Sequence, residues 1–136
     1  MLQGIDPILT GELLAHLDAM GHADGVVVAD AHFPAERIAR RLVTLPALSA
    51  TDVIRALRTV LPLDTAPAVD VMEAEDGSAG AVHAELTAAA SASGDEVRVL
   101  PRADFYAEAE RAFLIVRTGE LRPFGNAILR KGLVAS

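Results

Sequence analysis

Residues 21–34 read Gly21-His22-Ala23-Asp24-Gly25-Val26-Val27-Val28-Ala29-Asp30-Ala31-His32-Phe33-Pro34. The β-branched run that ends at Ala29 is bounded by turn-forming residues, which is typical of a buried strand that runs parallel to its neighbours. Titratable side chains lie at both ends of this strand: His22 and Asp24 before it, Asp30 and His32 after it. Because ligands bind at the carboxyl ends of strands in open α/β sheets, the stretch favours an enzyme that acts on a small molecule.

The composition is that of one compact domain over residues 1–136. Apolar residues make up 51% of the chain but aromatic residues only 4%, so the core must be aliphatic. No apolar run approaches the roughly 20 residues that span a bilayer, and no signal peptide is apparent at the start. The sequence has no cysteine, which excludes disulfides and thiolate sites and favours a cytoplasmic protein.

The net charge of −7 argues against nucleic acids and anionic membranes as partners, because both are bound by clustered cations. Arg37, Arg40 and Arg41 are the densest basic group. A solvated helix face explains them better than a phosphate site. An acidic chain of this kind suits an enzyme that handles a neutral metabolite.

Hydrophobic periodicity predicts helices that alternate with strands. Thr10 and Ser49 are expected to cap helices, Gly21 to end the first of them in a left-handed conformation, and Pro62 to end the third. The expected helices are Thr10–Met20, Ala35–Leu42, 50–61 (with Val53, Ile54, Leu57, Val60 and Leu61 buried), Ala81–Ala92 and Ala103–Ala112; the expected strands are Gly25–Ala29, Ala68–Ala74, Val97–Leu100, Phe113–Val116 and Ala127–Leu129. This alternation predicts an α/β fold, a three-layer sheet with helices on both faces.

An ordered set of short motifs carries a resemblance to a known family. The motifs are Met20-Gly21-His22-x-Asp24, Asp30-Ala31-His32-Phe33-Pro34, Phe105-Tyr106, Thr118-Gly119-Glu120, Phe124-Gly125-Asn126 and Leu129-Arg130-Lys131-Gly132. Their order and spacing over the whole chain resemble the fucose mutarotase and ribose pyranase family, RbsD/FucU. His32-Phe33-Pro34 and Arg102 resemble the fucose branch, since the ribose branch usually has Gly-Leu-Pro and a histidine at these places.

The resemblance implies an isomerase of carbohydrate metabolism that interconverts cyclic forms of a monosaccharide, without cofactor or metal. Fucose-type members exchange the α and β anomers of the pyranose, and ribose-type members interconvert pyranose and furanose rings. Such proteins typically form homodecamers of two stacked five-membered rings, with active sites at subunit contacts. L-Fucose is the expected substrate; a ribose-type pyranase and a non-catalytic sugar-binding protein are the alternatives.

The resemblance also assigns roles to single residues. His22 is at the catalytic position, and a histidine can give and take protons near neutral pH. Asp30, Arg102 and Asn126 match sugar-binding positions, and Asp24 is a candidate to orient His22. Phe124 departs from the pattern, because the family usually has tyrosine there. Loss of one positioned donor costs on the order of 10²-fold in rate.

Simpler interpretations compete with some of these roles. From the residues alone, His22 after a helix is more often a C-cap than a catalyst. His22, Asp24, Asp30 and His32 suit Zn or Mn in type, but a strand separates the two pairs, so they need not converge on one ion. His32 fits a supporting hydrogen bond or the rim of a site equally well.

Two further groups have structural interpretations. Phe105 and Tyr106 favour helix packing over a sugar-stacking surface, although one of the two could stack. His83 lies in an alanine-rich stretch and is expected to be solvated. Arg130 and Lys131 are expected to pair with acidic groups of the same or a neighbouring subunit.

Overall fold

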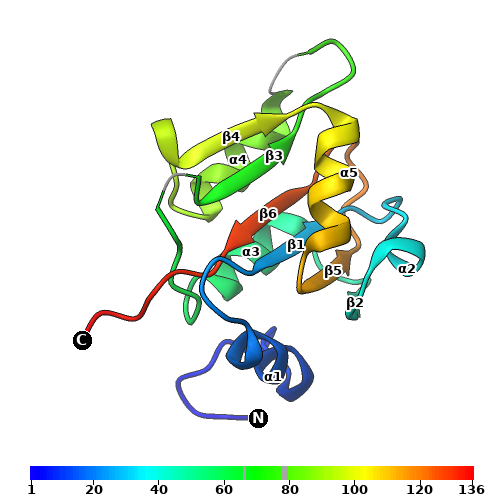
Figure 1. Cartoon of the computed structure of the whole chain (residues 1–136). Coiled ribbons are helices and arrows are strands. Elements are labelled where there is room, and N and C mark those ends of the chain that lie inside the picture. The colour runs from blue at the N-terminus through cyan, green and yellow to red at the C-terminus, as the bar shows by residue number, and fades with distance from the viewer. Residues whose placement is uncertain (66, 78–79) are drawn as a thin grey trace.

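The computed structural model describes residues 1–65, 67–77 and 80–136, and Figure 1 shows the path of the chain. Its elements, in chain order, are α1 (Gly11–Ala19), β1 (Gly25–Ala29), α2 (Ala35–Ile38), β2 (Leu42–Leu45), α3 (Ala50–Leu57), β3 (Val69–Met72), α4 (Gly80–Ala89), the 3₁₀ turn η1 (Gly94–Glu96), β4 (Val97–Leu100), α5 (Arg102–Arg111), β5 (Leu114–Thr118) and β6 (Ala127–Arg130). Within the described ranges no helix is long and apolar enough to cross a membrane.

The strands form one six-stranded mixed sheet in the order β2-β5-β1-β6-β3-β4. β1 pairs in parallel with β5, as expected, and antiparallel with β6. β6 also runs against β3, so it is the reversed strand between two parallel groups (Figure 1). The carboxyl ends of β1, β3, β4 and β5 therefore meet at one edge, together with the start of β6.

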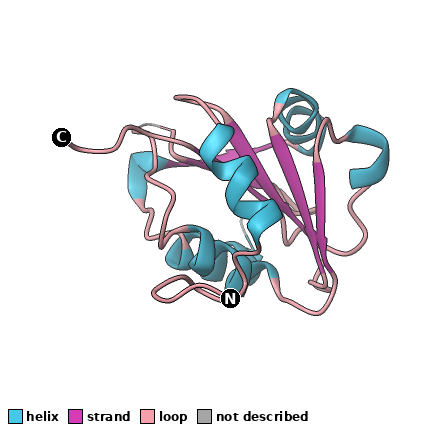
Figure 2. Cartoon of the chain, turned by 90° about the horizontal axis from the view of Figure 1, so that it is seen from below, coloured by secondary structure: helices cyan, strands magenta, loops and turns pink. Residues whose placement is uncertain are grey.

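Helices cover both faces of the sheet, which confirms the predicted α/β fold (Figure 2). Alternate strand residues point to opposite faces. Val26 and Val28 of β1 pack with residues of α1, α3 and α4, whereas Val27 and Ala29 pack with residues of α2 and α5. The core on each face is mainly aliphatic, as the composition indicated.

Both ends of α1 are predicted to within one residue, but the backbone conformation that follows the helix is not. Thr10 accepts a hydrogen bond from the Leu13 N–H at 3.2 Å, as an N-cap does. The last helical residue is Ala19, and the C-cap Met20 has an extended backbone. The left-handed residue in this connection is Ala23, with φ of +69°, rather than Gly21. The left-handed residue therefore lies two positions after the glycine that was predicted to adopt this conformation.

Two predicted helices are too long. α2 stops at Ile38, and Leu42, expected to end that helix, begins the edge strand β2. α3 starts as expected, with Ser49 accepting from the Asp52 N–H at 3.1 Å, but ends at Leu57, before Pro62. Val60 is therefore 40% exposed, not buried as its helical spacing predicted.

The region around α4 brings a second correction. His83 is only 2% exposed, not solvated, and neither of its ring nitrogens has a hydrogen-bond partner among the described residues. α4 ends at Ala89 rather than at the predicted Ala92, and Ser93 caps η1 together with Glu96. The acidic and glycine-rich residues 75–80 predict a surface loop, and residues 78–79 of this stretch lie outside the described residues.

Candidate functional site

A cavity of about 250 Å³ opens where the carboxyl ends of the parallel strands meet. Its size suits a small ligand, since cavities for drug-sized molecules hold roughly 300–1,000 Å³. It is lined by Asp30, His32, Phe33, Met72, Arg102, Tyr106, Leu121, Pro123, Phe124 and Asn126. The structure thus brings together five of the predicted site residues: Asp30, His32, Arg102, Phe124 and Asn126.

Asp30 and Asn126 form a reciprocal pair at the base of this cavity. The Asp30 N–H donates to Asn126 Oδ1 at 2.7 Å, and Asn126 Nδ2 donates to Asp30 Oδ2 at 3.0 Å. Asp30 Oδ1 accepts from the His32 N–H at 3.0 Å. Both side chains are buried, at 5% and 3% exposed, so the polar base of the cavity is fixed before any ligand binds.

Aromatic rings form one wall of the cavity. The Phe33 and Tyr106 rings lie 5.3 Å apart between centroids, and Phe33 meets Phe105 edge to face at 6.1 Å. Phe105 is fully buried in the core, whereas Tyr106 lines the cavity. Arg102, at the start of α5, has its guanidinium carbon 5.8 Å from the Tyr106 ring centroid. Of the two aromatic residues predicted to pack, one packs and one faces the cavity.

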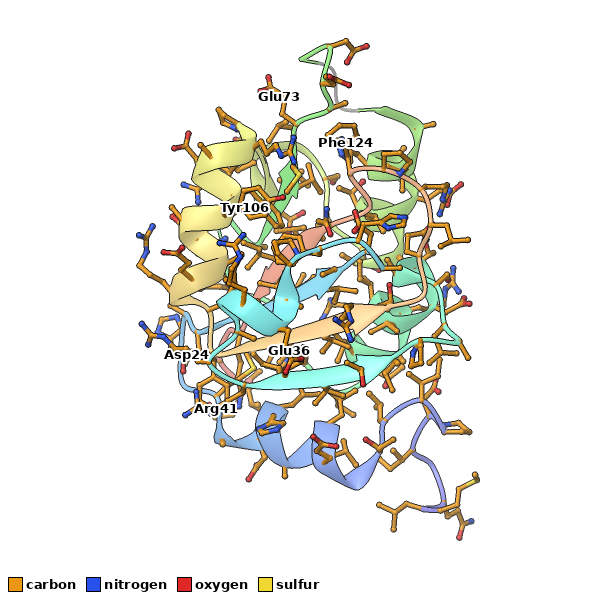
Figure 3. All side chains as sticks on the ribbon, turned by 90° about the vertical axis from the view of Figure 1, so that its right-hand side faces the viewer. Asp24, Glu36, Arg41, Glu73, Tyr106 and Phe124 are labelled. Atoms are coloured by element: carbon orange, nitrogen blue, oxygen red, sulfur yellow. The ribbon has the colours of Figure 1, made fainter. Side chains whose placement is uncertain are left out.

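The connection between β5 and β6 carries Phe124 over the cavity (Figure 3). Glu120 anchors it: the Ala31 N–H donates to the Glu120 backbone oxygen at 2.8 Å, and Arg122 Nε donates to Glu120 Oε1 at 2.9 Å. The hydrogen bond from Arg122 lowers the pKa of the Glu120 carboxyl. Arg122 Nη1 also reaches Glu85 of α4 at 2.7 Å, so an ion-pair chain ties this connection to the helix.

Phe124 and Gly125 form the tight part of the same connection. Phe124 has φ of +62°, uncommon for a bulky residue. A Cβ on Gly125 would lie 2.8 Å from Glu120 Cγ and 3.1 Å from the Arg122 oxygen, so a larger residue has no room. The Asn126 N–H donates to the Phe124 oxygen at 2.8 Å. This turn orients Asn126 toward Asp30 and explains the Phe-Gly-Asn motif in physical terms.

His22 lies at the opposite edge of the sheet, before β1. Its side chain is 54% exposed, and Nε2 is 3.2 Å from Asp64 Oδ1. Asp24, the predicted orienting carboxylate, instead accepts from the Gly21 N–H at 2.8 Å. The carboxylate that contacts His22 is therefore Asp64, which lies 42 residues away in sequence and belongs to no local motif.

The two ends of β1 are too far apart to form one site within a chain. Asp24 and Asp30 are separated by a strand that rises about 3.3 Å per residue, or roughly 20 Å in all. In Figure 3, Asp24 and the cavity residue Phe124 lie toward opposite ends of the sheet. Within the described part of the chain, no group of three or more His, Asp or Glu side chains is arranged to hold a metal ion.

Sequence reasoning did not predict several residues of these two regions: Asp64 beside His22, and Phe33, Met72, Leu121 and Pro123 in the lining of the cavity. For the pair Phe105 and Tyr106 the sequence favoured packing but left a stacking role open for one of them, and it is Tyr106 that lines the cavity. Met72 looked like an ordinary strand residue. Asp64 could be found only through the tertiary pairing that brings the segment before β3 next to His22.

The fold and the cavity define an α/β protein with a small pocket, polar at its base and aromatic along one wall, at the carboxyl edge of a mixed sheet. Residues 3–134 match the model of the RbsD / FucU transport protein family. The chain therefore belongs to this family.

Solved structures agree with this assignment. A fucose mutarotase from Streptococcus pneumoniae in complex with L-fucose is 27% identical, with a TM-score of 0.89 over 98% of this chain and 100% of that one. FucU from Bifidobacterium longum is 32% identical, with a TM-score of 0.86 over 98% and 100% of the two chains. Protein Atu2016, for which sugar binding has been suggested, is 33% identical, with a TM-score of 0.92 over 99% and 97%.

The Bacillus subtilis RbsD bound to D-ribose shares the fold, with a TM-score of 0.77 at 23% identity, over 99% of this chain and 100% of that one. These similarities establish the family and its fold.

Proposed function

We propose that this protein is a sugar mutarotase that exchanges the α and β anomers of a free aldose, with L-fucose as the substrate. The observation that carries the proposal is the buried Asp30–Asn126 pair beside an aromatic wall, in a cavity of small-molecule size. The similarity to a fucose mutarotase that binds L-fucose supports the choice of sugar. We further propose the cytoplasm as its compartment, on the absence of cysteine.

The cavity offers the groups that a monosaccharide needs. Ionised Asp30 accepts hydrogen bonds only, so its remaining lone pairs take sugar hydroxyls as donors. Arg102 presents forked donors to ring or hydroxyl oxygens. The Tyr106 ring, half-buried between Phe33 and Arg102, gives the C–H face of a sugar an apolar surface. Together these groups bind and orient a sugar at the anomeric carbon.

Mutarotation then requires two proton transfers. One proton goes to the ring oxygen and one leaves the anomeric hydroxyl, which opens the ring to an aldehyde. Rotation about the C1–C2 bond and reversal of both transfers close the ring on the other carbonyl face. A histidine can carry protons in both directions, and His22 is the residue proposed for this role.

His22 can act on a sugar held by Asp30 only if the two residues come from different copies of the chain. The separation of about 20 Å along β1 forbids the contact within one copy, and His22 is exposed. We therefore propose that the active site lies between subunits, in a homodecamer of two stacked five-membered rings. This assembly makes each copy supply a sugar pocket to one site and a histidine to another.

Phe124 favours a second candidate function. Its side chain lines the cavity but carries no hydroxyl, so the donor that family members place there is missing. Tyr106 is the single tyrosine of the sequence. A protein that binds the sugar but does not speed its exchange would keep this cavity and lose that donor. Sugar binding without catalysis is therefore the alternative.

The test is saturation-difference NMR on the anomeric protons of L-fucose, D-ribose and D-galactose. Wild type should transfer magnetisation between the anomers of L-fucose, and His22→Ala should abolish the transfer. His16→Ala, on α1, is the control and should behave as wild type. Binding of L-fucose without transfer would support the binding-protein alternative, and transfer confined to D-ribose would replace the proposed substrate.

A further inference from the structure

The opening of a sugar ring moves two protons, and one group can carry both only through a charged intermediate. If His22 first takes the proton of the anomeric hydroxyl, the sugar is an anion until its ring oxygen is protonated. A second group that gives a proton to the ring oxygen in the same step avoids that charge. Such a group must lie in the cavity that holds the sugar.

Most side chains that line the cavity are unsuited to this step. The apolar ones are Phe33, Met72, Leu121, Pro123 and Phe124. The Arg102 guanidinium stays charged, an ionised Asp30 only accepts hydrogen bonds, and the Asn126 amide does not titrate. A phenol such as that of Tyr106 gives up its proton only near about pH 10. Among the described residues of the lining this leaves His32, because an imidazole gives and takes protons near neutral pH.

His32 is fixed at the cavity through its backbone and has a free ring. Its N–H donates to Asp30 Oδ1 at 3.0 Å, just beyond the end of β1. The next residue, Phe33, is buried against the rings of Phe105 and Tyr106. His32 itself is exposed, and its ring forms no hydrogen bond, ion pair or ring contact with any other described residue. Both ring nitrogens are therefore open to a ligand and to exchange of protons with water.

We propose that His32 is a second catalytic residue: it protonates the ring oxygen of the sugar while His22 of the neighbouring copy deprotonates the anomeric hydroxyl. The inference rests on the proposed mutarotase function and on the site between copies. The C1–O5 bond breaks and its electron pair stays on O5, which takes the His32 proton. The electron pair of the O1–H bond forms the second bond between C1 and O1, and His22 keeps the proton.

Ring closure reverses these transfers after rotation about the C1–C2 bond. O5 attacks the other face of the carbonyl carbon and returns its proton to His32, while His22 returns its own to O1. The enzyme and the sugar then have the protons with which they started, so the reaction needs no further reactant. The two histidines exchange the roles of acid and base between opening and closure.

His32→Gln tests the proposal, with His16→Gln on α1 as the matched control. The amide leaves polar atoms at the cavity but does not titrate, and the backbone N–H bond to Asp30 remains. The rate at saturating sugar should fall about 100-fold, for whichever of L-fucose, D-ribose and D-galactose wild type exchanges fastest. KM should change less than about threefold. His16 does not line the cavity, so the rate of its variant should stay within about twofold of wild type.

The pH profile separates proton transfer from a structural role. The active form has one histidine protonated and the other neutral, so the wild-type rate at saturating sugar should fall on both sides of neutral pH. The fall above neutral pH reports loss of the donor proton, and His32→Gln should lack it. The other titratable groups of the lining are Asp30, Arg102 and Tyr106, whose side-chain types ordinarily titrate outside this range.

Tyr106→Phe tests the competing donor, since it removes only the hydroxyl. It should lose clearly less rate than His32→Gln, and the melting temperatures of all variants should agree within a few degrees. A rate in His32→Gln within about threefold of wild type, or an unchanged fall above neutral pH, overturns the proposal and leaves the mutarotase function standing. If wild type accelerates the exchange of none of the three sugars, the proposed function and this inference fail together.

Discussion

Asp30 and Asn126 satisfy part of each other's hydrogen-bonding capacity in the absence of a ligand. Each oxygen of the Asp30 carboxylate already takes one N–H, from His32 or from Asn126. A carboxylate oxygen has a second lone pair, so Asp30 can accept sugar hydroxyls without breaking these bonds. Under the proposed function, sugar binding therefore requires little rearrangement of this pair, which keeps the entropic cost of binding low.

Phe124→Tyr is the residue-scale test of the missing donor. Because the Phe124 side chain lines the cavity, the added hydroxyl can reach a bound sugar, and we expect L-fucose exchange to rise, by up to about 100-fold for a donor at a reacting oxygen. Anomer exchange measured by NMR at several sugar concentrations checks this. Phe113→Tyr, at a ring stacked with Arg41 away from the cavity, is the control. No change, or a fall, in Phe124→Tyr indicates a different substrate.

Single residues also show how far sequence reasoning reaches. Asp30 is placed by a strand recognisable from its own residues, and Asn126 by a compact motif, so both could be predicted. Asp64 could not, because its contact with His22 depends on two chain segments held by the end of β6. His83 was misjudged for a similar reason, since its burial comes from packing beyond its own helix.

At the scale of elements, α2 and β2 show where local patterns fail. Ile38 and Leu42 are four residues apart, a spacing that suits a helix. Leu42 instead pairs with Ile115 of β5 in the sheet. A four-residue strand at a sheet edge carries too few residues to reveal its alternation, so tertiary pairing decided its structure.

His83 gives α4 a stability that depends on pH. Burial of its ring lowers the pKa of His83, partly offset by the nearby Phe124 carbonyl. The folded-state pKa thus lies below the unfolded value of about 6.5, so the stabilisation is complete above pH 6.5 and is lost as the pH falls from there toward the folded pKa. The free energy of unfolding in urea should therefore fall more between pH 7.5 and pH 5 in wild type than in His83→Leu.

The same variant has an expected behaviour at pH 7.5. Neither ring nitrogen of His83 has a hydrogen-bond partner in the described part of the chain, and a buried unpaired polar group costs about 1–3 kcal/mol. His83→Leu should consequently be at least as stable as wild type at this pH. Equal pH dependence of the two proteins would show that His83 is not the titrating group.

Gly132→Ala tests the close packing that follows β6, where the Gly132 N–H donates to the Pro62 oxygen at 2.8 Å. The new Cβ would lie 2.3 Å from the Leu63 oxygen, so the segment carrying Asp64 must move, and we expect a loss of about 1–3 kcal/mol in unfolding free energy. Gly11→Ala is a matched control, because nothing lies within 4 Å of its Cβ position at the start of α1. That change should be neutral or stabilise by up to about 1 kcal/mol. Urea denaturation measures both.

For the molecule as a whole, the cavity and His22 lie at opposite ends of the strands of one sheet. We propose that residues 1–136 fold as a single domain, since one sheet and the two cores on its faces draw on elements from α1 to β6. Under the proposed function, a monomer built this way has half of a site at each end. An interface that joins unlike patches closes into a ring when the rotation between copies allows it, which is the arrangement proposed here.

Mixing two inactive variants tests the shared site. Asp30→Asn chains keep His22 and His22→Ala chains keep Asp30, so sites between unlike chains can contain both wild-type residues. After unfolding and refolding an equal mixture, about one quarter of the wild-type exchange rate should return, because each half of a site is drawn at random from two kinds of copy. The separate variants, refolded alone, are the controls. No recovery would place His22 and Asp30 in separate functions.

β6 is only four residues long, yet Asn126 precedes its first residue and Lys131 follows its last. In the proposed ring the strand is a molecular ruler: its length sets the distance between the pocket that a copy offers one neighbour and the histidine that it offers another. A slip of β6 by one position would disturb both ends together. In the proposed ring, a change in β6 of one copy would then impair two active sites, one shared with each neighbouring copy.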